Sequence, residues 1–371
     1  MIEYICSMKI SEVIAVLEQA APLGTQESYD NSGLIVGDKN ATLTNALISL
    51  DCTEIIVEEA IQKGCNLIIS HHPIVFGGLK KITGKNYVER TVIKAIKNEI
   101  AIYAIHTNLD NYRFGVNAKI GEILGIKNPH ILSAKGEQLQ KLVTYVPTEH
   151  LQGVQDALFQ SGAGHIGNYS ECSFVTVGTG SYKANENANP AYGSKGERHQ
   201  ENEVKLEVLV EKTRSQSTIS ALLDSHPYEE VAYDLFDLAN FHPYMGSGMI
   251  GELDTEMDAI SFLQLLKERF NCGTIRHTKL CKESIKTVAW CGGSGSFLLG
   301  AAKAKKADIY ITGDFKYHEF FDAENQLIIA DIGHYESEQF TIELIKDIIT
   351  KKIPTFAPCL TENNTNPVKY F

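Results

Sequence analysis

Residues 46–70 read ALISLDCTEIIVEEAIQKGCNLIIS, and this stretch decides the fold class. Two short apolar runs, 46–51 and 66–70, flank a segment whose apolar residues recur at helical spacing and which stops at Gly64. Runs that are apolar at nearly every position, rather than at alternate ones, are typical of parallel strands covered on both faces. The stretch therefore predicts a strand–helix–strand unit of a parallel sheet.

The same alternation of strands and helices continues beyond this unit and returns near the end of the chain. The further elements that we expect are a helix at 87–98, strands at 100–105, 287–291, 308–312 and 326–331, a tight glycine loop at 292–296 and a helix at 297–305. This alternation of strands and helices predicts an α/β domain with a mostly parallel sheet and helices on both faces. We expect the blocks 1–135 and 246–371 to form two similar halves of one such sheet.

The middle block, 136–245, has a different order of elements. We expect strands at 141–146, 172–177, 204–210 and 232–238, and helices at 149–160 and 215–225. The order β-α-β-β-α-β is that of a ferredoxin-like α+β unit. A polar stretch rich in Gly and Asn, 183–202, predicts a long loop. Because inserted domains enter at surface loops, we interpret the block as an insertion into the α/β domain.

The composition favours a folded soluble protein of the cytoplasm. Of the 371 residues, 43% are hydrophobic and 22% charged, and 46 acidic against 34 basic residues give a net charge of −12. An acidic surface repels phosphate backbones, which disfavours nucleic acid as a partner. The eight cysteines form no C-x-x-C pair and fit reduced thiols. No signal peptide is expected, and no apolar run reaches the roughly 18 residues of a membrane span.

Candidate metal ligands follow three of the expected strands. They come after the strands that end at residues 70, 105 and 331, and they are His71, His72, Asp110, His334 and Glu338. Open α/β sheets place their ligand sites at the carboxyl edge of the strands, so these side chains are expected to meet. Three imidazoles and two carboxylates suit zinc, manganese or iron, and they exceed what one catalytic zinc needs. Two divalent metal ions sharing a bridging water are the simpler hypothesis, with zinc as the first candidate.

The spacing alone leaves a structural role for these histidines equally open. A lone histidine is more often a hydrogen-bonded structural residue than a ligand, and adjacent side chains on a strand point to opposite faces. His71 and His72 can share a site only where the strand turns into a loop. Pro73 favours such a turn, because it disfavours helix at the residue before it and removes a ladder donor.

Other polar residues are expected at the same edge. His318 and Asp314 follow the strand at 308–312, and they are candidates for hydrogen-bond partners of the ligands or, for His318, a proton shuttle. A structural turn is the alternative. His106 is a second candidate proton shuttle, or an anchor for the loop that carries Asp110. The loop 292–296 matches no nucleotide-binding fingerprint, so tight packing is favoured over anion binding.

Five separated stretches resemble the Nif-three-like family, also known as GTP cyclohydrolase 1 type 2 homologues. They are 28–37 (SYDNSGLIVG), 70–73 (SHHP), 106–110 (HTNLD), 312–318 (TGDFKYH) and 333–338 (GHYESE). The resemblance covers both outer blocks and, for long-form members, a PII/CutA-like insert, whose characteristic segment is similar to 226–230 (HPYEE). It implies a dinuclear metal centre and a toroidal homohexamer with the metal sites facing the interior. The ligands that it implies are His71, His72, Asp110, His334 and Glu338.

Some positions depart from the family pattern or extend it. Tyr29 stands where the family usually has tryptophan, an aromatic exchange that we expect to be tolerated. A family-like start begins at Met8, so residues 1–7 are expected to be an extension or a misassigned start. The resemblance also suggests that Asp30 and Asn31 border the site. In the insert, the Tyr and Glu residues of 226–230 are expected to contact a neighbouring subunit rather than a ligand, because sheet edges need covering.

The first functional hypothesis is a metal-dependent hydrolase. Two cations would turn a bridging water into a hydroxide nucleophile near neutral pH, while His318 or His106 transfers protons. The resemblance implies opening of the GTP ring, but no guanine-reading motif is visible, and a phosphoester or amide substrate fits the metals equally well. The alternative is a regulatory hexamer in which the metals are structural and the insert binds a small molecule or a partner.

Overall fold

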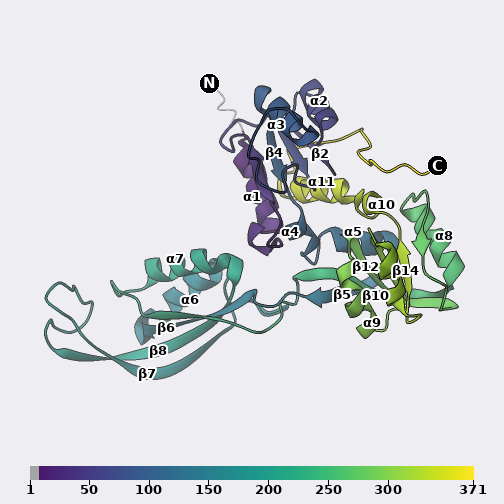
Figure 1. Ribbon diagram of the computed structural model, residues 1–371. Coiled ribbons are helices and arrows are strands. Elements are labelled where there is room, and N and C mark those ends of the chain that lie inside the picture. The colour runs from purple at the N-terminus through teal and green to yellow at the C-terminus, as the bar shows by residue number, and fades with distance from the viewer. Residues whose placement is uncertain (1–7) are drawn as a thin grey trace. The chain divides into compact units, whose positions relative to one another are not determined.

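The computed structural model describes residues 8–371, so the expected extension at residues 1–7 lies outside the described residues. The chain divides into two compact units (Figure 1). The outer unit runs up to Ser133 and resumes with Tyr244–Phe371, and the insert is Ala134–Pro243. These bounds lie close to the expected blocks. The assignment of the outer blocks as a metal-binding domain and of the middle block as a PII/CutA-like insert stays a prediction.

The first half of the outer unit is a five-stranded sheet in the order β1-β4-β3-β2-β15. The four strands β4, β3, β2 and β15 run parallel to one another, and β1 pairs antiparallel with β4 at the edge. The strands are β1 Gly33–Val36, β2 Ala46–Ser49, β3 Leu67–Ser70, β4 Ala101–Ala104 and β15 Cys359–Leu360. Every residue of β2, β3 and β4 is buried, which explains why their sequences are apolar without alternation.

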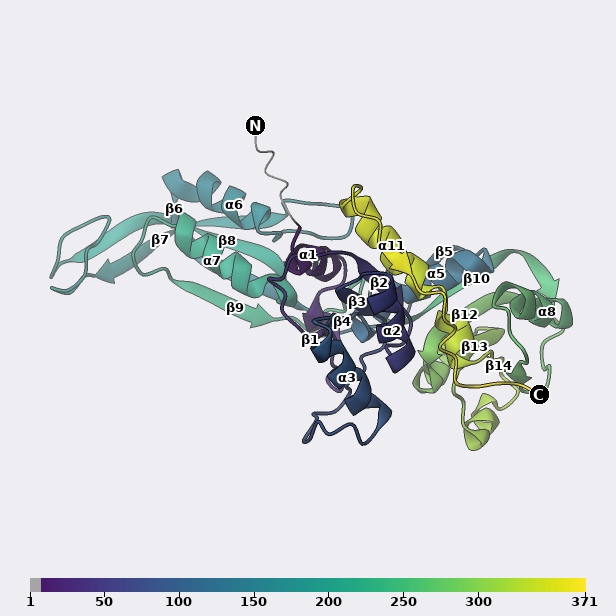
Figure 2. The ribbon, with the colours of Figure 1, turned by 90° about the horizontal axis from the view of Figure 1, so that it is seen from above.

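Helices cover both faces of this sheet (Figure 2). Side chains at successive strand positions point to opposite faces, so Ile48 packs in the core cluster of α1 and α11 while Leu47 packs in that of α2 and α3. The helices are α1 Ile10–Ala20, α2 Glu54–Gln62, α3 Tyr87–Lys97 and α11 Thr341–Lys352, with the 3-10 turn η1 Leu23–Thr25 after α1. The opening stretch of the sequence thus forms the expected β2-α2-β3 unit.

The second half is a six-stranded sheet in the order β11-β14-β13-β12-β10-β5. Its parallel core is β14, β13 and β12, and β11 and β10 pair antiparallel on either side. The strands are β5 Lys127–Ala134, β10 Gly246–Asp258, β11 Arg276–His277, β12 Ser284–Ser294, β13 Ile309–Gly313 and β14 Ile328–Asp331. The expected strands at 287–291, 308–312 and 326–331 form this core.

Further helices pack on both faces of the second sheet. They are α4 Thr107–Asp110, α5 Val116–Leu124, α8 Ala259–Arg269, α9 Leu299–Ala304 and α10 His334–Glu338, with the 3-10 turns η4 Ser296–Leu298 and η5 Tyr317–Ala323. Val288 shares a core cluster with α5 and α8, whereas Ala289 shares one with α9. The prediction of an α/β fold with two similar halves and helices on both faces is confirmed.

The expectation that both halves belong to one sheet is wrong. Throughout residues 8–371, the ladders of the two halves stay separate. In the first half, β1 pairs antiparallel at one edge of the parallel strands, and in the second half β11 does so. The parallel pairing ends at these strands and does not continue from one half into the other. The halves meet through side chains instead, because Ile69 of the first sheet and Ile311 of the second belong to one hydrophobic core.

The insert has the ferredoxin-like order β6-α6-β7-β8-α7-β9, as expected. Its sheet is antiparallel, in the order β7-β8-β6-β9, and α6 and α7 pack together. The elements are β6 Leu139–Pro147, η2 Thr148–His150, α6 Leu151–Gln160, β7 Ser173–Lys183, β8 Arg198–Glu211, η3 Lys212–Arg214, α7 Ser215–Ser225 and β9 Tyr233–Asp237.

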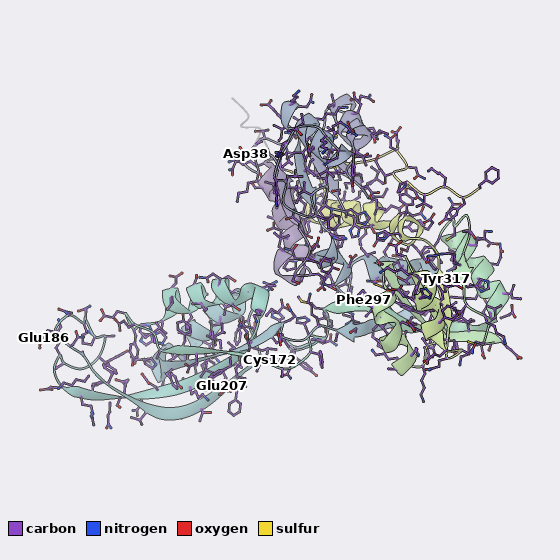
Figure 3. All side chains as sticks on the ribbon, viewed as in Figure 1. Asp38, Cys172, Glu186, Glu207, Phe297 and Tyr317 are labelled. Atoms are coloured by element: carbon purple, nitrogen blue, oxygen red, sulfur yellow. The ribbon has the colours of Figure 1, made fainter. Side chains whose placement is uncertain are left out.

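The expected loop at 183–202 is shorter than predicted. Lys183 pairs with Arg198, so β7 and β8 extend toward each other and leave only residues 184–197 as the connection. Both strands are mostly exposed in this region and carry no hydrophobic pattern from which they could be predicted. Backbone pairing and polar contacts, such as that of Tyr182 OH to Tyr192 O, define the hairpin, and Glu186 lies in its connection (Figure 3).

Two sequence expectations concern the chain as a whole. Within residues 8–371, no helix combines the length and the apolar character that crossing a membrane requires. The described cysteines are all free thiols, among which Cys52, Cys65, Cys272 and Cys291 are buried. The expected reading of the cysteines as unpaired thiols is confirmed for this part of the chain.

Candidate metal centre

The carboxyl ends of the parallel strands bring the five candidate ligands together. His71 and His72 directly follow β3, Asp110 ends the short helix α4 after β4, and His334 and Glu338 are the first and last residues of α10 after β14. Their potential ligand atoms form two groups, each within 4.8 Å. Subsite A consists of His72, His334 and Glu338, and subsite B consists of His71, Asp110 and Glu338. Such His/Glu groups can hold a metal ion, and both share one glutamate.

Glu338 connects the two subsites through its two oxygen atoms. Its Oε2 lies 3.0 Å from His72 Nε2 and 3.1 Å from His334 Nε2. Its Oε1 lies 3.7 Å from His71 Nε2, which is also 3.6 Å from Asp110 Oδ1. A carboxylate that places one oxygen in each of two ligand sets has the arrangement of a bridging ligand.

The turn after β3 lets two adjacent histidines enter one site. Strand β3 ends at Ser70, and the consecutive amides of His71 and His72 both donate toward the β2 side, to Ser49 O and Leu50 O, which a regular strand does not allow. The two imidazole rings lie only 4.9 Å apart, at an angle of 48°. The requirement that the strand turn into a loop at this point is therefore met.

His71, His72 and His334 each form a hydrogen bond through Nδ1, the ring nitrogen that faces away from the site. The acceptors are a carbonyl or a carboxylate: Ile105 O at 2.8 Å from His71, Asp51 Oδ1 at 2.8 Å from His72 and Asp314 Oδ2 at 2.6 Å from His334. Such oxygens cannot donate, so Nδ1 must carry the proton and donate to them. This fixes the ring orientation and leaves each Nε2 facing the site, the arrangement that metal-binding histidines show in proteins.

Glycines allow the backbone to approach the Glu338 carboxylate closely. Gly293 has φ +62°, and a Cβ there would lie 2.4 Å from Glu338 Oε1. Gly333, with φ +95°, precedes His334 at the start of α10. The glycine loop 292–296 therefore packs against the site, and its first three residues belong to β12. This supports the tight-packing interpretation of that loop.

Subsite B contains two polar atoms that the protein itself does not satisfy. Among the described residues, His71 Nε2 and Asp110 Oδ1 are buried and have no hydrogen-bond partner. Leaving a buried polar atom unpaired costs about 1–3 kcal/mol, so native structures rarely retain such atoms without a ligand. A lone pair on an imidazole nitrogen and a carboxylate oxygen are both donors to a divalent cation, so the residues fit a metal ion.

The carboxylates and imidazoles of the site strongly affect one another's ionisation. Burial opposes the charged form of His72 and His334, but their carboxylate partners outweigh it and raise the pKa to about 9 and about 11, respectively. Burial, aided by the Glu338 charge, raises the pKa of Asp110 to about 7. The pKa of Glu338 is held well below its usual value because His334, His71 and His72 outweigh its burial.

His106 joins the site as a fourth histidine. It offers a ring nitrogen within 4.8 Å of those of His71 and His72, and its Nδ1 lies 2.8 Å from Asp30 Oδ1. Asp30 also accepts from the Thr107 amide at 3.0 Å. These hydrogen bonds outweigh the burial of Asp30 and hold its pKa well below the usual range. Asp30 thus borders the site, and His106 is oriented by a carboxylate.

His318 lies apart from these groups. It is exposed in the turn η5, where its ring stacks on Phe321 at 6.4 Å and meets Tyr317 edge-on at 5.2 Å. Tyr317 itself projects from the surface (Figure 3). Within the described chain, His318 belongs to none of the groups of potential ligand atoms. Its role as a proton shuttle stays a prediction, whereas Asp314 does contact His334.

Sequence reasoning missed Asp51 and Thr365. Asp51 follows β2 at the same sheet edge as His71, so the strand-end argument would have found it. Thr365 donates through its hydroxyl to Asp51 Oδ2 at 2.5 Å. It belongs to a stretch without regular secondary structure, where no periodic pattern indicates a neighbour.

Comparison with known proteins gives consistent matches over nearly the whole chain. A family model described as Duf34/NIF3 (NGG1p interacting factor 3) matches residues 8–367. A protein of Halalkalibacterium halodurans named GTP cyclohydrolase 1 type 2 homolog is 40% identical over 332 residues, which are 88% of this chain and 89% of that protein. A Bacillus subtilis protein of the same name is 35% identical and covers 98% of this chain and 99% of its own length.

Solved structures give the same result. The crystal structure of a Bacillus cereus protein related to NIF3 superposes with a TM-score of 0.85 at 35% identity, and covers 98% of this chain and 100% of that one. A Staphylococcus aureus protein superposes with a TM-score of 0.77 at 29% identity and covers 98% and 99%. The resemblance of the five sequence stretches is confirmed, and the chain belongs to the Duf34/NIF3 family.

Proposed function

We propose that this protein is a hydrolase that depends on two divalent metal ions, one in each subsite. The observation that carries the proposal is the position of Glu338, whose two oxygens face two separate sets of imidazole and carboxylate groups. Each subsite then offers three protein ligands, the number that catalytic zinc sites use while keeping a position open for water. Zinc is the first candidate, with manganese and iron as alternatives.

Two cations held here would acidify a water molecule and polarise the acceptor oxygen of a substrate. The contribution of the chain is to hold the Nε2 atoms and the carboxylates in a fixed geometry, from which a binding cation displaces the protons. Asp51 and Asp314 keep two of the rings in the required tautomer. Because Glu338 has a lowered pKa, its carboxylate stays ionised for binding.

His106 is the better placed of the two candidate proton shuttles. Its ring lies 5.2 Å from that of His71 and 5.4 Å from that of His72, and the Asp30 carboxylate orients it. A histidine fixed by a carboxylate beside a reacting centre is a common general acid or base. Among the hydrogen bonds and ion pairs of residues 8–371, His318 has no such carboxylate partner, and it lies exposed, which makes it the second candidate.

The substrate class is proposed from the relatives, whose name, GTP cyclohydrolase 1 type 2 homolog, points to GTP. A phosphoester or an amide suits the same groups. The exposed ring of Phe76 packs edge-on against His106 at 5.6 Å and would contact a substrate that approaches this edge. We also propose a homohexamer with the sites facing its interior, which light scattering on purified protein would test.

Metal analysis of native protein followed by a hydrolase screen with the bound ion tests the proposal. We expect about two ions per chain, and turnover of GTP or of a phosphoester or amide that Glu338→Ala and His71→Ala abolish while the proteins stay folded. Unchanged turnover in variants shown to lack metal would contradict it.

The competing function, a regulatory assembly with structural metals, makes a different prediction for chelation. A catalytic site loses turnover on chelation while the assembly survives. If the assembly dissociates on chelation and no substrate of the screen is ever turned over, the structural role is correct.

A further inference from the structure

After β15, the last strand, a polar segment passes along the sheet edge of the outer unit at which the candidate ligands lie. We call residues 361–366 the strap. It begins directly after β15 and is anchored on Glu59 of α2, whose carboxylate accepts from the Glu362 amide at 2.9 Å and from Asn363 Nδ2 at 2.8 Å. The Thr361 hydroxyl donates to the same carboxylate. The first part of the strap is therefore fixed to the first half.

Further along, the strap contacts the carboxylate that orients a candidate ligand. Thr365 Oγ1 donates to Asp51 Oδ2 at 2.5 Å, while Asp51 Oδ1 accepts from His72 Nδ1 at 2.8 Å. Both oxygens of Asp51 are thus occupied, one by the strap and one by the imidazole. This hydroxyl–carboxylate–imidazole chain fixes the rotation of the carboxylate and, through it, the plane of the His72 ring.

The next residue of the strap contacts the second half. Asn366 Nδ2 donates to Glu336 Oε1 at 3.0 Å, and Glu336 lies in α10 between His334 and Glu338. Two consecutive strap residues therefore bind next to the two protein segments that meet in subsite A. Subsite B has no such contact among the described hydrogen bonds, because His71 is oriented by the backbone of Ile105.

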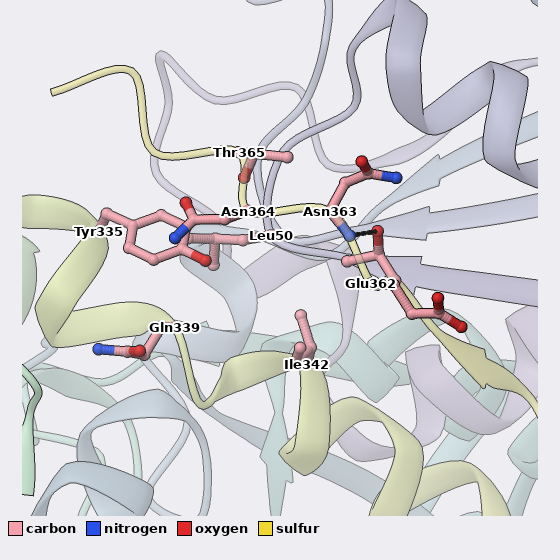
Figure 4. A pocket seen from close by; sticks show the side chains of 9 residues that line it. Leu50, Tyr335, Gln339, Ile342, Glu362, Asn363, Asn364 and Thr365 are labelled. Carbon is pink, nitrogen blue, oxygen red and sulfur yellow. Dashed lines mark hydrogen bonds between the residues drawn. The ribbon is translucent and has the colours of Figure 1, made fainter. Parts of the chain in front are cut away.

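The strap is held by polar contacts more than by apolar packing. A cavity of about 160 Å³ lies beside it, lined by Thr361–Thr365 of the strap and by Leu50, Tyr335, Gln339 and Ile342 (Figure 4). Residues 362–364 are exposed, while Thr365 and Asn366 are partly buried where they meet their carboxylates. Thr365 and Asn366 are therefore held at this edge by their own hydrogen bonds to Asp51 and Glu336, while the Glu362 and Asn363 contacts keep the start of the strap on Glu59.

We propose that Thr365 is a positioning residue of subsite A that acts through Asp51 on His72, and that the strap joins the two halves of the centre at this subsite. The inference rests on the proposed two-metal function. Partners that orient a ligand typically contribute about 10–100-fold to metal affinity. Thr365 acts on His72 only through Asp51, one hydrogen bond further from the ion than such a partner. We therefore expect an effect on metal affinity at the lower end of that range, confined to one of the two ions.

Cobalt titration of the metal-free full-length protein tests the proposal, because Co²⁺ bound to nitrogen and oxygen ligands is visible in absorption. Thr365→Val removes the hydroxyl and keeps the shape of the side chain. We expect one of two Co²⁺ equivalents to bind about tenfold more weakly, with a changed absorption band, while the other equivalent is unaffected. Thr365→Ser, which keeps the hydroxyl, should restore the wild-type titration.

Thr361→Val is the matched control. It removes a hydroxyl–carboxylate hydrogen bond from the same strap, but at Glu59, away from the histidines. We expect it to leave both Co²⁺ equivalents unchanged. Equal losses in the two variants, or weakening of both equivalents by Thr365→Val, or no effect of Thr365→Val at all, would overturn the proposal. Wild-type protein that binds fewer than two Co²⁺ would instead overturn the two-metal function on which it rests.

Discussion

Histidines and carboxylates gather both in the candidate metal centre and in the insert. The insert cluster consists of His150, His199, Tyr182, Tyr192, Tyr228, Glu149, Glu201 and Glu203. Its groups satisfy one another: Tyr228 OH donates to Glu203 Oε1 at 2.8 Å, and His199 Nε2 lies 3.0 Å from Glu201 Oε2. In the metal centre, by contrast, His71 Nε2 and Asp110 Oδ1 have no hydrogen-bond partner within residues 8–371.

The backbone explains this difference. The insert cluster lies largely on the β7–β8 hairpin, where antiparallel pairing places Tyr182 opposite His199, and the side chains of residues 149, 150 and 228 join it there. In the metal centre, parallel strands deliver side chains from distant parts of the chain to one edge, and each ring nitrogen that faces outward is already bonded. The same residue types therefore give a structural network in one place and a candidate ligand site in the other. The two clusters differ in whether their polar atoms have hydrogen-bond partners, and not in their residue composition.

The largest expected effect is at the residue shared by both subsites. Glu338→Gln keeps the size of the side chain but removes the charge that faces His72 and His71. We expect loss of both bound metal ions and a fall in turnover beyond the roughly 100-fold that loss of an orienting partner can cause. Elemental analysis and initial rates measure this.

Glu203→Gln in the insert cluster is the matched control for that variant. Glu203 accepts from Tyr228 and contacts no candidate ligand among the described hydrogen bonds. Metal content and turnover should stay at the wild-type level. If the two variants lose metal to the same extent, the distinction between the two clusters is broken.

A smaller effect is expected where a carboxylate only orients a ring. Asp314→Asn weakens the hydrogen bond to His334 Nδ1, now 2.6 Å long, and should lower metal affinity about 10–100-fold without unfolding the protein. Glu201→Gln, which changes the same kind of pair at His199, should leave affinity unchanged. Competition with a coloured chelator measures both. Equal affinities of wild type and Asp314→Asn would show that Asp314 has no orienting role.

Proton release gives a third test. The carboxylate partners of His72 and His334 raise their pKa values in the metal-free protein to about 9 and about 11, which favours the protonated ring near pH 7, so a proton must leave Nε2 when a cation binds there. Metal affinity should therefore rise with pH, by up to about tenfold per pH unit for each proton released; the rise becomes less steep once pH passes the pKa of about 9 of His72 and ends above that of about 11 of His334. Calorimetry in buffers of different ionisation enthalpy counts the protons. Affinity that does not depend on pH between 6 and 8 would contradict this.

The regular parts of the fold could be predicted from the sequence. The buried strands β2, β3 and β4 are short apolar runs, and α7 begins and ends where its helical spacing does, at Ser215–Ser225. The five candidate ligands were predicted because each follows a strand, which fixes their common edge but not their contacts.

Other features depend on tertiary pairing, which leaves no local signal. The separation into two sheets depends on which edges pair, and the β7–β8 hairpin around Arg198 carries no hydrophobic pattern. The partners Asp51 and Thr365 are 314 positions apart in the chain, so only the folded structure shows that they meet. His318 was chosen by its place after a strand, but the turn η5 carries it to the surface.

The smallest expected effect is in the insert cluster itself. Burial and the Glu203 carboxylate raise the pKa of Tyr228, so its phenol stays a neutral donor across the physiological range. Tyr228→Phe removes that donor and leaves Glu203, which is only 8% exposed, without this partner. Loss of such a hydrogen bond costs about 1–3 kcal/mol of unfolding free energy, because a buried acceptor is left unsatisfied. Denaturant unfolding of the full chain, followed by a probe in the insert, measures it.

Tyr228→Phe is informative because it should leave metal binding and turnover unchanged. A self-satisfied network has no free ligand atoms, so its disruption should cost stability and change neither Co²⁺ binding nor turnover. The metal centre should behave in the opposite way, since its unpaired atoms cost stability until a cation binds and restores it in proportion to the logarithm of the metal concentration. Metal added to Tyr228→Phe should therefore stabilise the outer unit as it does in wild type and leave the loss in the insert uncorrected. If metal instead corrects the loss in the insert, the two clusters are energetically coupled, and the insert takes part in the function of the site.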